Sequence, residues 1–250
     1  MSVAAAIFSL PRQTLEAMAE AGRDVRTWER ILGQTGDTVI SEVTQAAPKL
    51  VLWTHYPPGD VYDTRHHAQY YFHLHPELER PFGELGHFHT FLRGPAMAVE
   101  ESIDVVCHLI AIGVSEQGRA VRLFTTNRWV TDETWRPASE VSAMLDRFSI
   151  GHAQPSWPVN RWVGAVLRLF RPQIIALLAE RDRAVAAWTC ADPNTDTLED
   201  RALEVTSLVA ISVEEQLTLI EQSLAQSGAP ARPAASAAEQ DANNFPAPAE

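Results

Sequence analysis

The sequence contains little of what several classes of protein need. Its two cysteines, Cys107 and Cys190, form no C-x-x-C pair, so we expect a reducing compartment and no disulfide framework. The 20 basic residues are outnumbered by 32 acidic residues, which gives a formal net charge of −12. Nucleic acids and anionic membranes bind basic surfaces, so we expect neither as a partner.

Long apolar segments and common catalytic motifs are also missing. No segment reaches the roughly 18 consecutive apolar residues of a membrane span. Residues 1–13 lack the basic start of a secretory signal, so we expect a cytoplasmic protein. The motifs G-x-S-x-G, G-x-G-x-x-G, H-E-x-x-H and the P-loop are absent. Their absence disfavours serine hydrolases, Rossmann dehydrogenases, zincins and nucleotide enzymes.

The composition is that of an ordinary globular protein, with 46% hydrophobic and 21% charged residues. Apolar spacing, proline positions and the capping box Ser212-Val-Glu-Glu215 predict helices at both ends of the chain. The predicted helices cover residues 9–33, 37–47, 137–148, 158–188 (broken at Pro172) and 212–226. Residues 227–250 are rich in Ala and Pro, which predicts a disordered tail after a single domain over residues 1–226.

Runs of β-forming residues lie between these helices. The predicted strands cover residues 50–56, 69–75, 86–92, 105–114, 120–126 and 203–211. Pro57-Pro58-Gly59-Asp60 predicts a turn, and the runs at 105–114 and 120–126 predict a hairpin. The last run could instead belong to a helix that continues to residue 226. The pattern favours an α+β fold in which an antiparallel sheet of five to six strands carries N-terminal and C-terminal helices.

Histidines are concentrated in one part of the chain. Seven of the nine lie within residues 55–89, where two His-x-His pairs flank a loop rich in Pro, Gly and Glu. Residues i and i+2 of a strand point to the same face, so His73 and His75 share a face, as do His87 and His89. If the two strands pair, the four imidazoles can converge, because cross-strand Cβ atoms lie about 4.5–5.5 Å apart.

A patch of imidazoles is typical of a transition-metal site. Neutral imidazole binds iron, copper, nickel and zinc, whereas calcium and magnesium prefer oxygen ligands. We favour iron or copper, with zinc as a further candidate and non-covalent haem as an alternative. A carboxylate could join the histidines, and the nearby ones are Asp60, Asp63, Glu77, Glu79 and Glu84. A metal-free polar pocket and an ordinary solvated surface are the interpretations without a metal.

Four further residues are candidates for the site. His108 is a metal-ligand candidate if its strand lies beside the histidine pairs, although its neighbours at i±2 are apolar. Asp60 and Tyr62 could orient an imidazole or transfer a proton. Arg93 could bind an anionic substrate through its two-pronged guanidinium. The simpler interpretations are a turn cap for Asp60, a strand-end charge for Arg93 and a core residue for His108.

The segments HYPPGDVYD, QYYFHLHP and GHFHTFLRGPAM, within about residues 50–100, resemble those of a family of uncharacterised bacterial proteins. This resemblance implies no activity and no ligands. From the residues themselves, the leading hypothesis is a metal-dependent oxidoreductase or oxygenase with a non-haem iron or copper site and a small-molecule substrate. The alternatives are a haem- or metal-binding carrier or sensor without turnover, and a metal-free small-molecule pocket.

Overall fold

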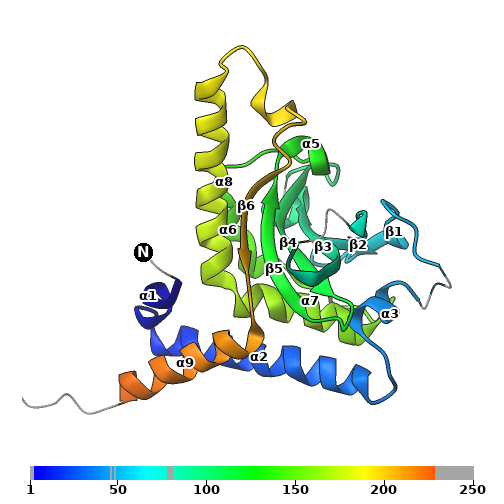
Figure 1. Cartoon of the computed structure of the whole chain (residues 1–250), viewed down its shortest axis with the longest axis vertical. Coiled ribbons are helices and arrows are strands. Elements are labelled where there is room, and N and C mark those ends of the chain that lie inside the picture. Colours follow the sequence, from blue (N-terminus) through cyan, green and yellow to red (C-terminus); the bar gives the residue numbers. More distant parts are fainter. Residues whose placement is uncertain (1–2, 46, 48, 78–80, 99, 229–250) are drawn as a thin grey trace, which may run out of the picture.

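The sheet of this protein is a simple meander. The structure is a computed structural model that describes residues 3–45, 47, 49–77, 81–98 and 100–228. Six strands form one sheet in which each strand pairs in antiparallel fashion with the next along the chain (Figure 1). The strands are β1 (Tyr56–Tyr62), β2 (Ala68–His73), β3 (Glu84–Arg93), β4 (Val106–Ser115), β5 (Ala120–Thr126) and β6 (Val205–Ala210).

Helices lie before, between and after these strands, which confirms the predicted α+β fold. They are α1 (Val3–Phe8), α2 (Arg12–Gly33), α3 (Val39–Val43), α4 (Gly94–Met97), α5 (Arg128–Thr131), α6 (Ala138–Met144), α7 (Trp157–Leu169), α8 (Arg171–Ala191) and α9 (Val213–Gly228). The long helix α8 packs against β5 and β6, and α2 packs against both α7 and α9 (Figure 1). One cluster of buried hydrophobic side chains joins these helices to the sheet.

The two faces of the sheet carry different side chains, because successive residues of a strand alternate between faces. The helix-covered face is apolar, and the ring centroid of Phe88 lies 5.7 Å from that of Trp162 in α7. On the same face, the buried Tyr70 hydroxyl donates a hydrogen bond to Asn160 of α7. The opposite face carries polar and aromatic side chains from β2 and β3, namely Gln69, Tyr71, His73, His87, His89, Phe91 and Arg93.

The first strand differs from its prediction. Residues 50–55 lie outside the sheet, and β1 runs through the Pro57-Pro58-Gly59-Asp60 segment that predicts a turn. This is possible because β1 is an edge strand that pairs only with β2, at Tyr56, Val61 and Tyr62. Prolines are tolerated on an edge because the missing N–H groups have no ladder partner to lose.

Other elements agree more closely with their predicted positions. The hairpin of β4 and β5 is confirmed, as are the strand β6 and the separation of α7 from α8 next to Pro172. The helix predicted over 37–47 is shorter, and α1 is a separate helix that the pattern misses. The second strand ends at His73, so His75 lies beyond it. The predicted tail lies, from residue 229 on, outside the described residues.

In the part of the chain that the structure describes, no single helix combines the length and apolar character needed to cross a bilayer. Among the helices of this described part, α7 and α8 meet that length and composition when taken together, with a bend of 72° between them.

Trp162 of α7 contacts both the sheet, at Phe88 of β3, and helix α2. It is fully buried, and its indole Nε1 donates a hydrogen bond to Glu29 of α2. We expect Trp162→Ala to lower the free energy of unfolding by about 3–5 kcal/mol, measured by urea denaturation. Trp157→Ala, in the first turn of the same helix and 41% exposed, should lower it by less than about 1 kcal/mol. Equal losses would contradict this view of the core.

Candidate metal centre

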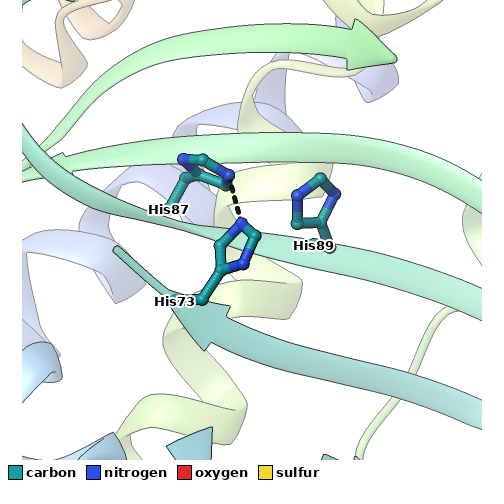
Figure 2. A group of neighbouring side chains, drawn as sticks. All are labelled: His73, His87 and His89. Carbon is teal, nitrogen blue, oxygen red and sulfur yellow. Dashed lines mark hydrogen bonds between the residues drawn. The ribbon is translucent and has the colours of Figure 1, made fainter. Parts of the chain in front are cut away.

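Three histidines converge on the sheet face opposite the helices. His73 of β2 stands directly across from His87 of β3, and His89 follows two residues later on β3. Figure 2 shows the three rings turned toward one another, with His73 and His87 in direct contact. One ring nitrogen from each residue can be chosen so that the three atoms all lie within 4.8 Å of one another. The geometry is therefore that of a group that could hold one metal ion.

A carboxylate sets the orientation of His87. Its Nδ1 lies 2.7 Å from Glu84 Oε1, so the carboxylate accepts the Nδ1 proton and the lone pair of His87 is left on Nε2. That Nε2 is 2.6 Å from His73 Nε2. Residues three apart in a regular strand face opposite sides. A bulge between Glu84 and Gly86 breaks that alternation and puts Glu84 beside His87.

Glu84 is itself held firmly. Arg122 of β5 donates from Nε to Glu84 Oε2 at 2.6 Å, and both side chains are buried. A side chain at Gly113 of β4 would overlap this carboxylate, since a Cβ there would clash with Oε2. The absence of a side chain at position 113 thus makes room for the pair. Arg122 also lies over the ring of Phe124, 3.9 Å from its centroid.

A second hydrogen bond orients His89. Its Nδ1 is 3.1 Å from His108 Nε2, while its Nε2 is buried without a hydrogen-bond partner among the described residues. His108 reaches this face because a bulge on β4 sets it across from Phe91 while Ile110 stays across from Thr90. Glu133 accepts a hydrogen bond from the backbone N–H of His108 at 2.8 Å. An unsatisfied ring nitrogen therefore points to the place where His73 and His87 meet.

The four imidazoles are held neutral by burial. Removal from water lowers the pKa of His87 and His89 well below the usual value, and lowers that of His108 to about 3. Burial, followed by the neighbouring imidazoles, lowers the pKa of His73 to about 2. Neutral imidazole is the form that binds a metal ion.

A cavity of about 370 Å³ adjoins two of the three histidines, His87 and His89. His75, His87 and His89 form part of its wall, and Arg122, Phe124 and Thr126 of β5 form another part. The imidazole of His75 lies 5.0 Å from that of His73 and 4.9 Å from that of His87, measured between ring centroids. Trp53 packs against the His75 ring, with 4.0 Å between ring centroids.

The structure separates the candidate residues into two groups. His73, His87 and His89 form the convergent set, His75 borders it, and His108 contacts it through His89. Asp60, Tyr62 and Arg93 line a different cavity, of about 550 Å³, on the same face of the sheet. Asp60 does orient an imidazole, but it is that of His55, with 3.0 Å between Oδ1 and Nδ1.

Three functional contacts escape the sequence reasoning. Glu84 stands out only as one of several loop carboxylates, whereas its contact with His87 depends on a bulge. Arg122 and Glu133 come from later parts of the chain and carry no local signal. The spacing Glu84-Leu-Gly-His87 is the one cue, because a glycine in a strand pattern suggests a bulge.

We expect the stability of the metal-free protein to fall as the pH is lowered. An unfolded chain protonates its histidines near pH 6.5, whereas the folded protein keeps His73, His87, His89 and His108 neutral at that pH. Below about pH 6.5 each of them should therefore remove up to about 1.4 kcal/mol per pH unit from the free energy of unfolding. Burial raises the pKa of Glu133 to about 7. In the same pH range the folded protein therefore binds one proton on Glu133 that the unfolded chain does not bind, which offsets the contribution of one histidine.

The measurement is urea denaturation with a chelator present at about pH 7.5, 6.5 and 5.5. A free energy of unfolding that stays constant over this range would show that these imidazoles are not buried as neutral groups.

Comparisons with known proteins assign a family but no activity. No curated protein and no solved structure gives a significant match to this chain. Residues 19–211 match the model of a family described as a domain of unknown function, DUF6969. The match includes every residue of the histidine centre and of both cavities named above. Because it covers more than half of the sequence, the chain belongs to the DUF6969 family, whose function is unknown.

Proposed function

We propose that this protein is a metal-dependent enzyme in which His73, His87 and His89 bind one transition-metal ion next to a substrate cavity. The observation that carries the proposal is the buried, unpartnered Nε2 of His89, which lies beside the facing nitrogens of His73 and His87. A buried polar atom without a partner destabilises a protein by about 1–3 kcal/mol. A bound metal ion would satisfy that nitrogen.

The outer hydrogen bonds support a metal over a metal-free polar pocket. Metal-binding histidines usually donate their second N–H to a carboxylate or another acceptor, which aims the lone pair of the first nitrogen at the ion. Glu84 does this for His87, and His108 is in place to do it for His89. An ordinary surface patch is disfavoured because His87 and His89 are almost fully buried.

The spacing of the His73 and His87 nitrogens requires only a small adjustment, and the nitrogen of His89 lies within 4.8 Å of both. Two nitrogens bound to one ion at about 2.1 Å lie about 3.0–3.4 Å apart. His73 Nε2 and His87 Nε2 are 2.6 Å apart, so the two rings would separate by less than about 1 Å. Binding would also displace the proton that one of these two nitrogens carries in the metal-free protein.

Iron or copper is the favoured ion, and the favoured reaction is an oxidation. Three neutral nitrogen ligands suit both metals and leave coordination positions open for oxygen or substrate. Zinc would accept the same ligands and is distinguished by the experiment below. Haem has less support, because the imidazoles of His73, His87 and His89 lie only 4.4–5.1 Å apart, which leaves no flat slot between them.

The cavity favours turnover over a role as carrier or sensor. A bound ion would supply Lewis-acid or redox chemistry at the three imidazoles. Phe124 and Val130 give the cavity an apolar wall, and the hydroxyl of Thr126 provides a polar contact for a small molecule. Arg122 contributes positive charge, part of which its contact with Glu84 neutralises. A closed storage site would not need such a space.

Metal content tests the proposal directly. We expect protein purified without an affinity tag and reconstituted with Fe(II), Cu(II) or Zn(II) to bind about one equivalent, measured by mass spectrometry of the metals. His89→Ala should lower the affinity by at least about tenfold, because it removes one of three ligands. His152→Ala provides a control, since His152 lies outside the centre and contacts the carbonyl oxygen of Tyr62.

The identity of the tightest ion decides the reaction class. Preferential binding of iron or copper, with oxygen consumption that depends on the bound ion, would support an oxidoreductase. Zinc alone would overturn that part of the proposal. A wild-type protein that retains less than about 0.2 equivalents of any metal after reconstitution would overturn all of it.

Glu84 should tune the metal affinity without touching the metal. Glu84→Gln keeps the shape of the side chain but removes the charge that holds Arg122 and strengthens the His87 lone pair. We expect the dissociation constant for the metal to rise about 10–100-fold in a chelator competition. The matched control is Glu199→Gln, because Glu199 pairs with Arg128 on the surface. Similar metal affinities of the two variants would show that Glu84 does not support metal binding by His87.

A further inference from the structure

A second cavity lies on the same face of the sheet, beside the edge strand. It measures about 550 Å³, a size that suits small molecules. Its polar lining comes from β1, β2 and β3: Asp60, Tyr62, Gln69 and Arg93, together with His55 from the segment before β1. Gln69 and His73 are four residues apart on β2, which sets their backbones about 13 Å apart. His55 lies between the two places, since its ring centroid is 6.0 Å from that of His73. The two cavities are therefore neighbours on one face.

The polar side chains of this cavity are linked in a chain of hydrogen bonds. Arg93 donates from Nε to Gln69 Oε1 at 2.7 Å, and Gln69 donates from Nε2 to Asp60 Oδ2 at 2.6 Å. The other oxygen of Asp60 contacts His55 Nδ1 at 3.0 Å. The buried Gln69 thus keeps the guanidinium and the carboxylate on opposite sides of its amide. Side chains held this way are ordered before a ligand arrives.

The guanidinium of Arg93 uses some of its N–H groups as hydrogen-bond donors to the protein. Its Nε contacts Gln69 and its Nη1 donates to the carbonyl oxygen of Ile103 at 3.3 Å. No ion pair joins it to an acidic residue among those that the structure describes, although the chain carries 32 acidic residues. Its remaining N–H groups can donate two parallel hydrogen bonds to a carboxylate. A half-buried arginine without an acidic partner indicates that the cavity accepts an anion.

Hydrogen-bond acceptors stand across from this cation. Asp60 is aimed into the cavity by a local distortion of β1, in which Gly59 and Asp60 adopt φ of 82° and 60°. The pairing of β1 with β2 is irregular over the same residues. The hydroxyl oxygen of Tyr62, which contacts His67 Nδ1, supplies another acceptor. Such distortions recur where a strand must direct a side chain to a site.

We propose that this cavity binds a small molecule that carries a carboxylate and an ammonium group, as a free amino acid does. Arg93 holds the carboxylate, and Asp60 with the Tyr62 hydroxyl accepts the hydrogen bonds of the ammonium group. A simple anion would satisfy Arg93 but would face the negative charge of Asp60 across the cavity. A simple amine would satisfy Asp60 but would face the positive charge of Arg93.

This inference is independent of the metal proposal. The ring of Tyr71 stacks on His55 with 3.6 Å between centroids and lies 5.2 Å from His89, so aromatic rings fill the space between the two places. His55 also lies 6.0 Å from His73 between ring centroids, but the proposed ligand contacts use Arg93, Asp60 and Tyr62. Loss of metal would leave Arg93, Gln69 and Asp60 in place, because none of them contacts His73, His87 or His89 in the structure.

The test is calorimetric titration of the full chain with each of the twenty amino acids, in the presence and absence of EDTA. At least one should bind with a dissociation constant below about 1 mM. The deaminated acid and the decarboxylated amine of that amino acid should each bind at least about tenfold more weakly, because each lacks one charge-assisted contact. Absence of heat and of thermal stabilisation with every amino acid at 10 mM would overturn the proposal.

Two variants separate recognition from folding. Arg93→Gln should weaken binding of the amino acid at least about tenfold, while Arg12→Gln on the exposed side of α2 should leave it unchanged. Asp60→Asn keeps an oxygen acceptor and tolerates the positive φ. It should weaken binding of the amino acid but not binding of the deaminated acid. A purely structural role of Asp60 would not produce this difference between the two ligands. Equal weakening of both ligands would overturn the assignment.

Discussion

Antiparallel pairing of β2 with β3 places His73 across from His87 and Tyr71 across from His89, and the rest of the candidate site depends on this register. A shift of one residue would turn the histidines of one strand toward the helices and the aromatic core residues toward the cavities. Phe72 and Phe88 resist such a shift because both are fully buried on the helix side, where Phe88 contacts Trp162. The apolar core thus determines which way the imidazoles face.

Departures from regular strand geometry complete the arrangement. One bulge on β3 puts Glu84 beside His87, and another on β4 turns His108 toward His89. A distorted segment in β1 aims Asp60 at the second cavity. Each of these polar groups is buried or half-buried with specific partners, such as Arg122 for Glu84. Regular alternation would have turned Glu84 and His108 toward the helix-covered, apolar face.

Much of the fold can be predicted from local patterns. The hairpin of β4 and β5, the division of α7 from α8 next to Pro172 and the strand β6 follow from β-propensity, turn residues and proline chemistry. The first strand cannot be predicted in this way, because Pro57-Pro58-Gly59 is tolerated in a strand only where one side of it has no neighbour. Whether a strand lies at an edge is a property of the finished sheet, as the strand order β1 to β6 illustrates.

The sequence by itself determined that imidazoles would gather on one sheet face, since the i, i+2 spacing of His87 and His89 requires only that the segment be a strand. It also determined that imidazole nitrogens would be the dominant polar atoms on that face. Tertiary structure decided that His73 joins them while His75 stays at the border, and that Glu84, Arg122 and His108 orient the rings. These contacts depend on strand register, on bulges and on residues distant along the chain, and local sequence periodicity encodes none of the three.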